Sequence, residues 1–355
     1  MELSKQETNI IKGLAALFLV FLHLFDTREY AGKIQSLLIL RDVPIEYYLS
    51  LATGACVPMY LFCSGYGLTI VNKKNINIKD NAIRVLKLLI NYWIVLIAFV
   101  IIGHLLGNNN YPGSIKEFLM NFFLLSKSYN GAWWFLQTYV ILVFLSPVII
   151  KLVNKNNSLI VFFISGVLYF VAFLQSVRGL IIVGNNEFIL IIYNMIINFL
   201  NCQFSFIVGV IFIKESIITK IRYKLKEKAY AQLLSYMLIV FTIVMNVIIE
   251  NWVIGPITAI LVITTFSIIR LNEKIKCILH NISIHSTNIW LTHMFFYMIF
   301  FEDLIYMPKY SIFIFIWLIA ICIATSYIIN TIYKPIVKII NNRIESNSKT
   351  INMYN

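Results

Sequence analysis

The chain has 355 residues, of which 60% are apolar and only 13% charged, and its mean hydropathy is +0.82. A soluble domain of this length could not bury so much apolar surface, so the composition excludes a soluble enzyme and predicts a polytopic membrane protein. The formal charge of +13 is large enough to suggest nucleic-acid binding, but its distribution along the chain favours another origin.

Ten apolar stretches approach the length of about 20 residues that a membrane-spanning helix needs. They begin near Ile10, Tyr47, Arg84, Ala132, Ser158, Asn194, Tyr230, Trp252, Ile282 and Ser311. The expected fold is an all-α bundle of about ten transmembrane helices, with one membrane domain over residues 1–340 and a short polar cytoplasmic tail over residues 341–355. The sequence shows no internal repeat, so an inverted-repeat transporter gains no support.

Basic residues divide unevenly between the two sides of this arrangement. With the N-terminus inside, 22 of the 29 Lys and Arg residues fall on the inner side, together with seven of the 16 acidic residues. The inner face then carries about +15 and the outer face about −2. This asymmetry predicts cytoplasmic N- and C-termini, and it explains the basicity by topology rather than by nucleic-acid binding. The many Ile, Asn and Lys residues resemble the composition of a low-GC bacterium, so we expect a bacterial plasma membrane.

The first apolar stretch, NIIKGLAALFLVFLHLF, carries Lys12 near its start and His23 near its end. Eleven positions at about 100° each place both side chains on one helix face, about 16 Å apart along the axis. An ionisable group inside an apolar span is a candidate functional residue. A purely structural role, in which His23 bonds a backbone carbonyl or a neighbouring helix, is about as well supported as a functional role. Other polar groups at similar depth must decide between these two interpretations.

The second and third stretches add further candidates. In GACVPMYLFCSGYGLTI, Pro58 can kink the helix, and the small residues around Ser64 allow close approach of another helix or of a ligand tail. The third stretch begins with Arg84 and Lys87 at its cytoplasmic end. This pair is typical of the positive-inside rule, but together with Lys12 it could also neutralise the phosphates of a nucleotide-type acyl carrier.

The segment IKEFLMNFFLL, between the third and fourth stretches, is amphipathic and too short to span, so we expect it to be interfacial or re-entrant. The fourth stretch opens with Trp133 and Trp134. This position favours anchoring at the membrane interface over stacking on a substrate, and Trp134 is in addition a candidate for the acyl passage. The five cysteines show no metal-type spacing, and we expect neither a disulfide framework nor a metal site.

The ninth stretch, SIHSTNIWLTHMFFY, is unusually polar. His285, Asn288 and Thr292 lie on one stripe at positions i, i+3 and i+7, and His293 lies near mid-span. Polar groups at membrane depth mostly face the bundle interior, where they find partners or line a wet cavity. Three of the five histidines therefore lie in two helices, which indicates a site between the first and ninth spans.

Five of these segments, in this order, resemble signature blocks of the acyltransferase-3 family of integral membrane acyltransferases. The block IKGLAALFLVFLHLF is similar to the family's basic residue, ten residues and His, with Lys12 where Arg is commoner. The later blocks that show the resemblance are PMYLFCSGYGL, RVLKLLINYW, AWWFLQTYVIL and SIHSTNIWLTHMFF. Three positions depart from the pattern: Lys87 replaces an Arg, Ile90 stands where Pro is frequent, and Ala132 stands where many members have His. No SGNH-type esterase domain follows the spans, so the membrane domain is expected to deliver the acyl group itself.

The resemblance implies transfer of an acyl group, usually acetyl, from cytoplasmic acyl-CoA to a hydroxyl of an extracytoplasmic polysaccharide or cell-wall glycan. His23 would deprotonate that hydroxyl or briefly carry the acyl group, and the sequence does not separate these roles. Asp26 would orient the imidazole. The predicted catalytic residues are His23, Asp26 and His293, the predicted acyl-CoA ligands are Lys12, Arg84 and Lys87, and the predicted passage residues are Ser64, Asn288 and Trp134.

Two other classes of protein fit part of the pattern. A transporter or flippase for a lipid-linked sugar would also place polar groups at mid-membrane and bases on the inner face. A structural subunit of a capsule-assembly complex would leave the intramembrane histidines unexplained. Consumption of acetyl-CoA distinguishes the acyltransferase from the transporter.

Overall fold

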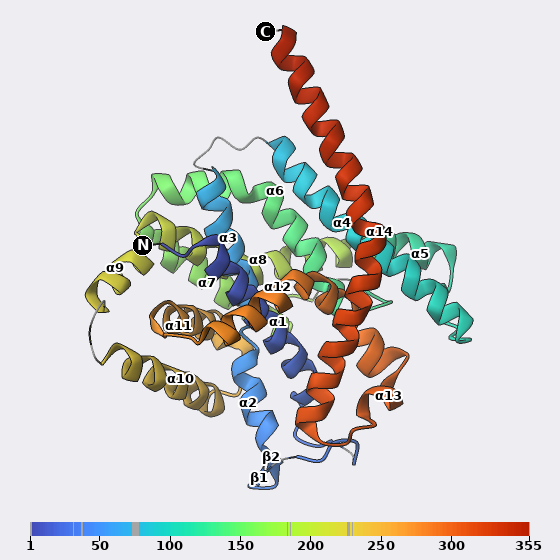
Figure 1. Ribbon diagram of the computed structural model, residues 1–355, viewed down its shortest axis with the longest axis horizontal. Coiled ribbons are helices and arrows are strands. Elements are labelled where there is room, and N and C mark those ends of the chain that lie inside the picture. The colour runs from blue at the N-terminus through green and yellow to red at the C-terminus, as the bar shows by residue number, and fades with distance from the viewer. Residues whose placement is uncertain are drawn as a thin grey trace.

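The computed structural model describes residues 2–30, 32–36, 38–72, 78–182, 184, 186–225, 228 and 230–354. Within these residues, each of the ten predicted apolar stretches is helical (Figure 1). They form α1 (Lys5–Phe25), α2 (Ile45–Thr53) with α3 (Cys56–Asn72), α4 (Ile78–Leu105), α6 (Trp134–Lys155), α7 (Ser158–Arg178), α8 (Glu187–Lys214), α10 (Ala231–Ile248), α11 (Gly255–Ile268), α12 (Glu273–Met294) and α14 (Ser311–Tyr354). The short elements are β1 (Ile39–Leu40), β2 (Val43–Pro44), α5 (Ile115–Phe122), η1 (Gly131–Trp133), α9 (Ile217–Leu225), η2 (Trp252–Ile254), the π-helical η3 (Phe295–Ile299) and α13 (Glu302–Tyr306).

The all-α membrane bundle is confirmed, and eight of the ten predicted spans meet a simple measure of length and hydropathy. In the described part of the chain, eight helices are long and apolar enough to cross a membrane. The two predicted spans that fall short of this measure are the apolar helix over Trp252–Ile268, which has only 17 residues, and α12. Helix α12 is long enough, but its three histidines and its other polar residues make it too polar. Helix α12 lies near the centre of the view beside α1, and α11 packs against α10 and α3 (Figure 1).

The second predicted span is interrupted near its middle. Helix α2 ends at Thr53, and α3 begins only at Cys56. Pro58 accounts for this break, because its ring cannot donate a backbone hydrogen bond and clashes with the carbonyl group four residues earlier, at Gly54. The prediction of a kink is therefore correct, and the kink takes the form of a two-residue gap between helices.

Three glycines let helices touch backbone to backbone. A Cβ atom added at Gly13 of α1 would lie 2.0 Å from the carbonyl oxygen of Leu279 in α12. Helices α3 and α8 cross in the same way, since a Cβ at Gly65 would lie 2.0 Å from Phe206 O and one at Gly209 would lie 2.2 Å from Phe62 O. Small residues at such crossings are how membrane helices approach closely.

Substituting alanine at Gly65 is therefore expected to destabilise the protein by more than about 3 kcal/mol, the upper end of ordinary overpacking, because the obstacle is backbone. Thermal unfolding in detergent measures this. Gly67→Ala, two residues along the same helix, is the matched control, since nothing lies within 4 Å of its added methyl group. That variant should unfold at the same temperature as the parent or slightly higher, because alanine favours helix. Equal unfolding temperatures for both variants would contradict this account of the crossing.

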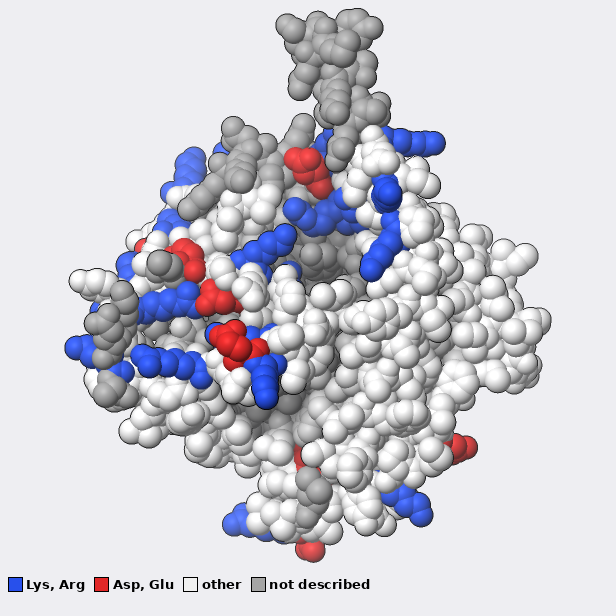
Figure 2. Space-filling model, in the orientation of Figure 1, with Lys and Arg blue, Asp and Glu red and all other residues white. Residues whose placement is uncertain are grey.

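Charged connections gather at the two ends of the bundle, called here the Lys5 end and the Phe25 end after the two ends of α1. At the Phe25 end, salt bridges join separate connections: Arg28 with Glu250, Lys33 with Glu302, and Lys116 with Glu187. At the Lys5 end, Arg222 pairs with Glu7. Each of these pairs joins segments that the charge asymmetry predicts on the same side. In Figure 2 most Lys and Arg residues gather in one region and around a hollow, and a broad surface beside it carries no charge.

The remaining predictions concern short segments. The amphipathic stretch after the third span forms α5, whose first turn is capped by the hydroxyl of Ser114, which accepts a hydrogen bond from Glu117 N at 3.1 Å. Its eight residues are too few to span a membrane. The predicted polar tail over 341–355 continues α14 as far as Tyr354. All five cysteines are free thiols.

Candidate active site

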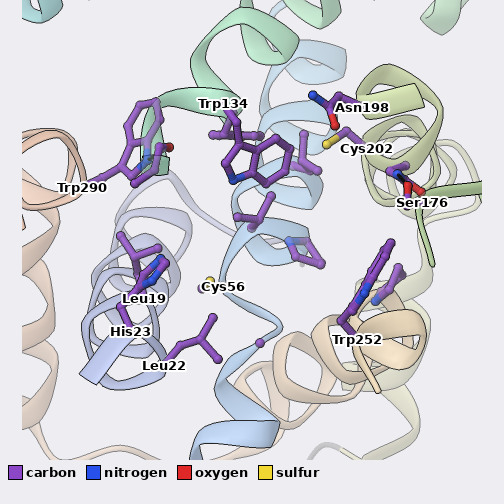
Figure 3. A pocket seen from close by; sticks show the side chains of 18 of the residues that line it. Leu19, Leu22, His23, Cys56, Trp134, Ser176, Asn198, Cys202, Trp252 and Trp290 are labelled. Atoms are coloured by element: carbon purple, nitrogen blue, oxygen red, sulfur yellow. Dashed lines mark hydrogen bonds between the residues drawn. The ribbon is translucent and has the colours of Figure 1, made fainter. Parts of the chain in front are cut away.

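A cavity of about 430 Å³ lies beside His23 (Figure 3). We call it the histidine chamber. Helix α1 supplies Leu19, Leu22 and His23 to one wall, and the opposite wall holds Ser176 and Trp252. Since Trp252 belongs to the connection that follows α10 at the Phe25 end, the chamber extends from mid-bundle toward that end. Figure 3 shows His23 and Trp252 on opposite sides of the open space.

A second cavity, of about 300 Å³, lies nearer the Lys5 end, and we call it the cation cavity. Lys12 of α1 and Arg84 of α4 line it, together with Ser64 and Tyr60 of α3. The Arg84 guanidinium donates a 2.9 Å hydrogen bond to the side-chain oxygen of Asn81, which holds it in place. Among its described lining residues there is no carboxylate, so both positive charges are available to an anionic ligand.

The two cavities meet at a shared wall. Four residues line both of them, one each from α1, α3, α6 and α12: Leu19, Val57, Phe135 and Trp290. Lys12, Leu19 and His23 follow one another along α1 at helical spacing, so one face of this helix runs from the cation cavity, past the shared wall, to the histidine chamber. At 1.5 Å per residue the two ends of this path are about 16 Å apart.

His23 lies against a second histidine. The rings of His23 and His293 are 4.9 Å apart between centroids, and the ring of Tyr297 lies 6.4 Å from that of His23. His293 is fully buried. Its Nδ1 lies 3.1 Å from Ile289 O and 2.8 Å from Trp290 O, so Nδ1 carries the hydrogen and donates it to these carbonyls. Its Nε2 then keeps a lone pair and has no hydrogen-bond partner in the described part of the chain.

Two hydrogen bonds attach the connection that precedes α6 to helix α12, beside the chamber. The indole nitrogen of Trp290 donates to Ala132 O at 3.0 Å, and that of Trp133 donates to Leu291 O at 3.1 Å. Both bonds join η1 to the part of α12 that precedes His293. Trp133 is buried and packs edge-on against Tyr92 at 4.8 Å, so it belongs to the core and is not an interfacial anchor. Trp134, the next residue, lines the chamber.

The structure does not bring every predicted residue to the two cavities. Asn288 is buried in a network in which it accepts from Asn91 Nδ2 at 2.7 Å and donates to Ser326 Oγ at 2.8 Å. Asp26 caps the end of α1 through its backbone, and its exposed side chain forms no hydrogen bond with His23 in the structure as described. Lys87 is half-buried on α4 and does not line the cation cavity. Direct roles for these three residues stay predictions from the sequence.

Comparison with known protein families decides what kind of protein holds these cavities. A family model described as an acyltransferase domain matches residues 6–331. The chain belongs to the acyltransferase-3 family. No curated protein and no solved structure matches the chain. As an acyltransferase-3 protein it is a membrane acyltransferase, and the matched residues contain both cavities and the paired histidines.

Acyl transfer to a hydroxyl needs a base at the reacting atoms, a place for the acyl carrier and a place for the acceptor. In this acyltransferase the paired histidines lie next to the histidine chamber, and the chamber shares a wall with the cation cavity. The described residues contain no group of three or more His, Cys, Asp or Glu side chains suited to a metal ion. Sequence reasoning missed Trp290, which lines both cavities, and Trp252. The signal available for Trp290 was its position three residues before His293 on the polar helix.

Proposed function

We propose that this chain is an O-acyltransferase of the bacterial plasma membrane that moves an acetyl group from cytoplasmic acetyl-CoA to a hydroxyl of an outer polysaccharide or cell-wall glycan. The observation that carries the proposal is the shared wall between the cation cavity and the histidine chamber. An acyl carrier bound on one side of that wall and an acceptor bound on the other would meet beside His23. The Lys5 end is cytoplasmic in this proposal, as the charge asymmetry of the sequence predicts.

The cation cavity suits the acyl carrier. Acetyl-CoA is a polyanion with a long, thin arm that ends in the thioester. Lys12 and Arg84 would attract its phosphates, and the guanidinium of Arg84 is already held by Asn81 before any ligand binds. The arm would then run along the face of α1 toward His23, past the apolar side chains of the shared wall, which would shield the thioester from bulk water.

The histidine chamber suits the transfer step. The acceptor hydroxyl oxygen attacks the thioester carbonyl carbon, His23 takes up the hydroxyl proton, and the carbon–sulfur bond breaks as the carbon–oxygen bond forms. The leaving thiolate recovers a proton from the His23 imidazolium, so the products are an acetyl ester and CoA thiol. The ring of His293 lies 4.9 Å between centroids from the ring that becomes positively charged, and the lone pair on its Nε2 would stabilise that charge.

Purified protein in nanodiscs, supplied with acetyl-CoA and with envelope glycan from cells that lack this chain, tests the proposal. Free CoA thiol and acetyl ester on the glycan should appear together in equal amounts. A transporter would leave acetyl-CoA intact, and release of CoA without ester would indicate a thioesterase. Either result would overturn the proposal.

Removing one of the two positively charged side chains of the cation cavity should weaken the binding of acetyl-CoA. Lys12→Ala and Arg84→Ala are each expected to raise KM for acetyl-CoA about tenfold, because a charged hydrogen bond contributes about 1.5–3 kcal/mol and tenfold corresponds to about 1.4 kcal/mol. Initial rates at varied acetyl-CoA measure the change. Lys155→Ala, at the same end of the bundle but outside this cavity, is the matched control. An unchanged KM in both test variants would exclude phosphate binding by this pair.

A further inference from the structure

A third cavity lies next to the histidine chamber. This cavity, of about 310 Å³, shares three lining residues with the chamber: Lys127, Trp134 and Asn198. Its further lining includes Gln137 of α6 and Asn194 of α8, and we call it the vestibule. Asn194 lies in the second turn of α8, which begins at the Phe25 end, and His23 lies in the last turn of α1 at the same end, so the vestibule and the paired histidines both lie in the half of the bundle nearer that end.

The walls of the vestibule are polar and carry little charge. They present the hydroxyl of Ser126 and the amides of Gln137, Asn194 and Asn198. The amide of Gln137 donates to Leu124 O at 2.7 Å, which fixes its orientation. Lys127 is the one Lys, Arg, Asp or Glu among the described residues that line the chamber or the vestibule. A ligand here would therefore be recognised through hydroxyl and amide hydrogen bonds rather than through ion pairs.

The chamber wall opposite His23 is also polar, and aromatic side chains add to it. Asn201 Nδ2 donates to Ser176 Oγ at 2.9 Å, while Asn201 Oδ1 has no partner among the residues described. Trp134 and Trp252 present indole rings to the same space (Figure 3). A pyranose ring has hydroxyl groups around its rim and C–H bonds on its faces, and such C–H bonds pack on the electron-rich face of an indole.

We propose that the chamber and the vestibule are consecutive subsites for an oligosaccharide acceptor. One sugar unit lies in the chamber with its reacting hydroxyl at His23, and the next unit lies in the vestibule. Trp134 and Asn198 form the boundary that both units touch. The inference rests on the proposed acetyl transfer to a glycan, and it adds that the acceptor is a chain of at least two sugar units rather than a single sugar or a lipid hydroxyl.

Acceptor length tests this arrangement. Envelope glycan from cells that lack this chain is cleaved and sized into fragments of one, two and four sugar units, and acetyl transfer from labelled acetyl-CoA to each is measured. The wild-type protein should show a kcat/KM at least tenfold higher for two units than for one, and little further gain for four. Asn194→Leu, which removes a vestibule amide at similar volume, should reduce the two-to-one ratio severalfold.

The outcomes separate the two proposals. Transfer to no fragment, with acetyl-CoA unconsumed, would overturn the proposed function itself. Transfer to all fragments with equal kcat/KM would leave the function standing and overturn the two subsites. A second variant, Trp252→Ala, should raise KM for every fragment while leaving KM for acetyl-CoA unchanged, because this indole lines the chamber and not the cation cavity. Trp317→Phe, on α14 outside both cavities, is the matched control and should match the wild type for each fragment length.

Discussion

Replacing His23 with alanine is expected to lower acetyl transfer by about 10²–10⁴-fold, the range that a positioned acid–base group contributes. His23 is the one histidine among the described residues that line the chamber, and the ring of the buried His293 lies 4.9 Å from it between centroids. The variant should still fold, because His23 is only partly buried and forms no hydrogen bond with another described side chain. Labelled acetyl ester formed per minute, at saturating acetyl-CoA, is the measurement.

The matched control is His104→Ala, which removes an exposed histidine at the Phe25 end of α4, outside both cavities. It should keep wild-type activity. Binding of acetyl-CoA to the His23→Ala variant, measured by calorimetry, should also be unchanged, because Lys12 and Arg84 remain. Full transfer activity in His23→Ala would show that the base lies elsewhere. Loss of acetyl-CoA binding together with activity would instead show that His23 supports the fold of the site.

The fold was predictable because few backbone conformations are stable in the hydrocarbon region of a membrane. A run of about 20 apolar residues must be helical, since only a helix satisfies every backbone group within the segment. The runs of α1 and α8 could therefore be located from composition alone. Two of the predicted spans are less typical: the helix over Trp252–Ile268 is short, and α12 is polar. The polar residues in the second half of α12 are buried against other helices, so this part of the helix needs no apolar surface toward lipid.

The candidate site was predictable only along single helices. Lys12 and His23 share a face of α1, as helical periodicity requires, and both line cavities. Periodicity also placed Asn288 on the interior face of α12, but it could not show that Asn91 and Ser326 would take up its hydrogen bonds. The chamber and the vestibule depend on how α6, α7 and α8 pack against one another. No local pattern encodes that packing, and Trp252 and Asn201 could not be found from the sequence.

His293 differs from the other polar residues of its helix because one ring nitrogen is fixed by hydrogen bonds while the other has no partner among the described residues. Two backbone carbonyls fix its Nδ1, which sets both the ring orientation and the tautomer, and leave Nε2 with a lone pair and no partner in the part of the chain that the structure describes. A buried polar atom without a partner costs free energy, so a purely structural histidine would be poorly placed here. The ring of His23 lies 4.9 Å from the ring of His293 between centroids.

Replacing His293 with asparagine is therefore expected to lower kcat by about 100-fold, at the lower end of the range for proton-transfer groups, because the His23 imidazolium would lose the neighbouring lone pair. KM for acetyl-CoA should change less than twofold, since His293 does not line the cation cavity. Steady-state kinetics at varied acetyl-CoA separates the two constants. His285→Asn is the matched control: His285 lies two turns earlier on α12, where its Nδ1 lies 2.9 Å from Ser326 Oγ, away from His23. A similar fall in kcat for both variants would mean that polar packing along α12, and not the lone pair beside His23, sets the rate.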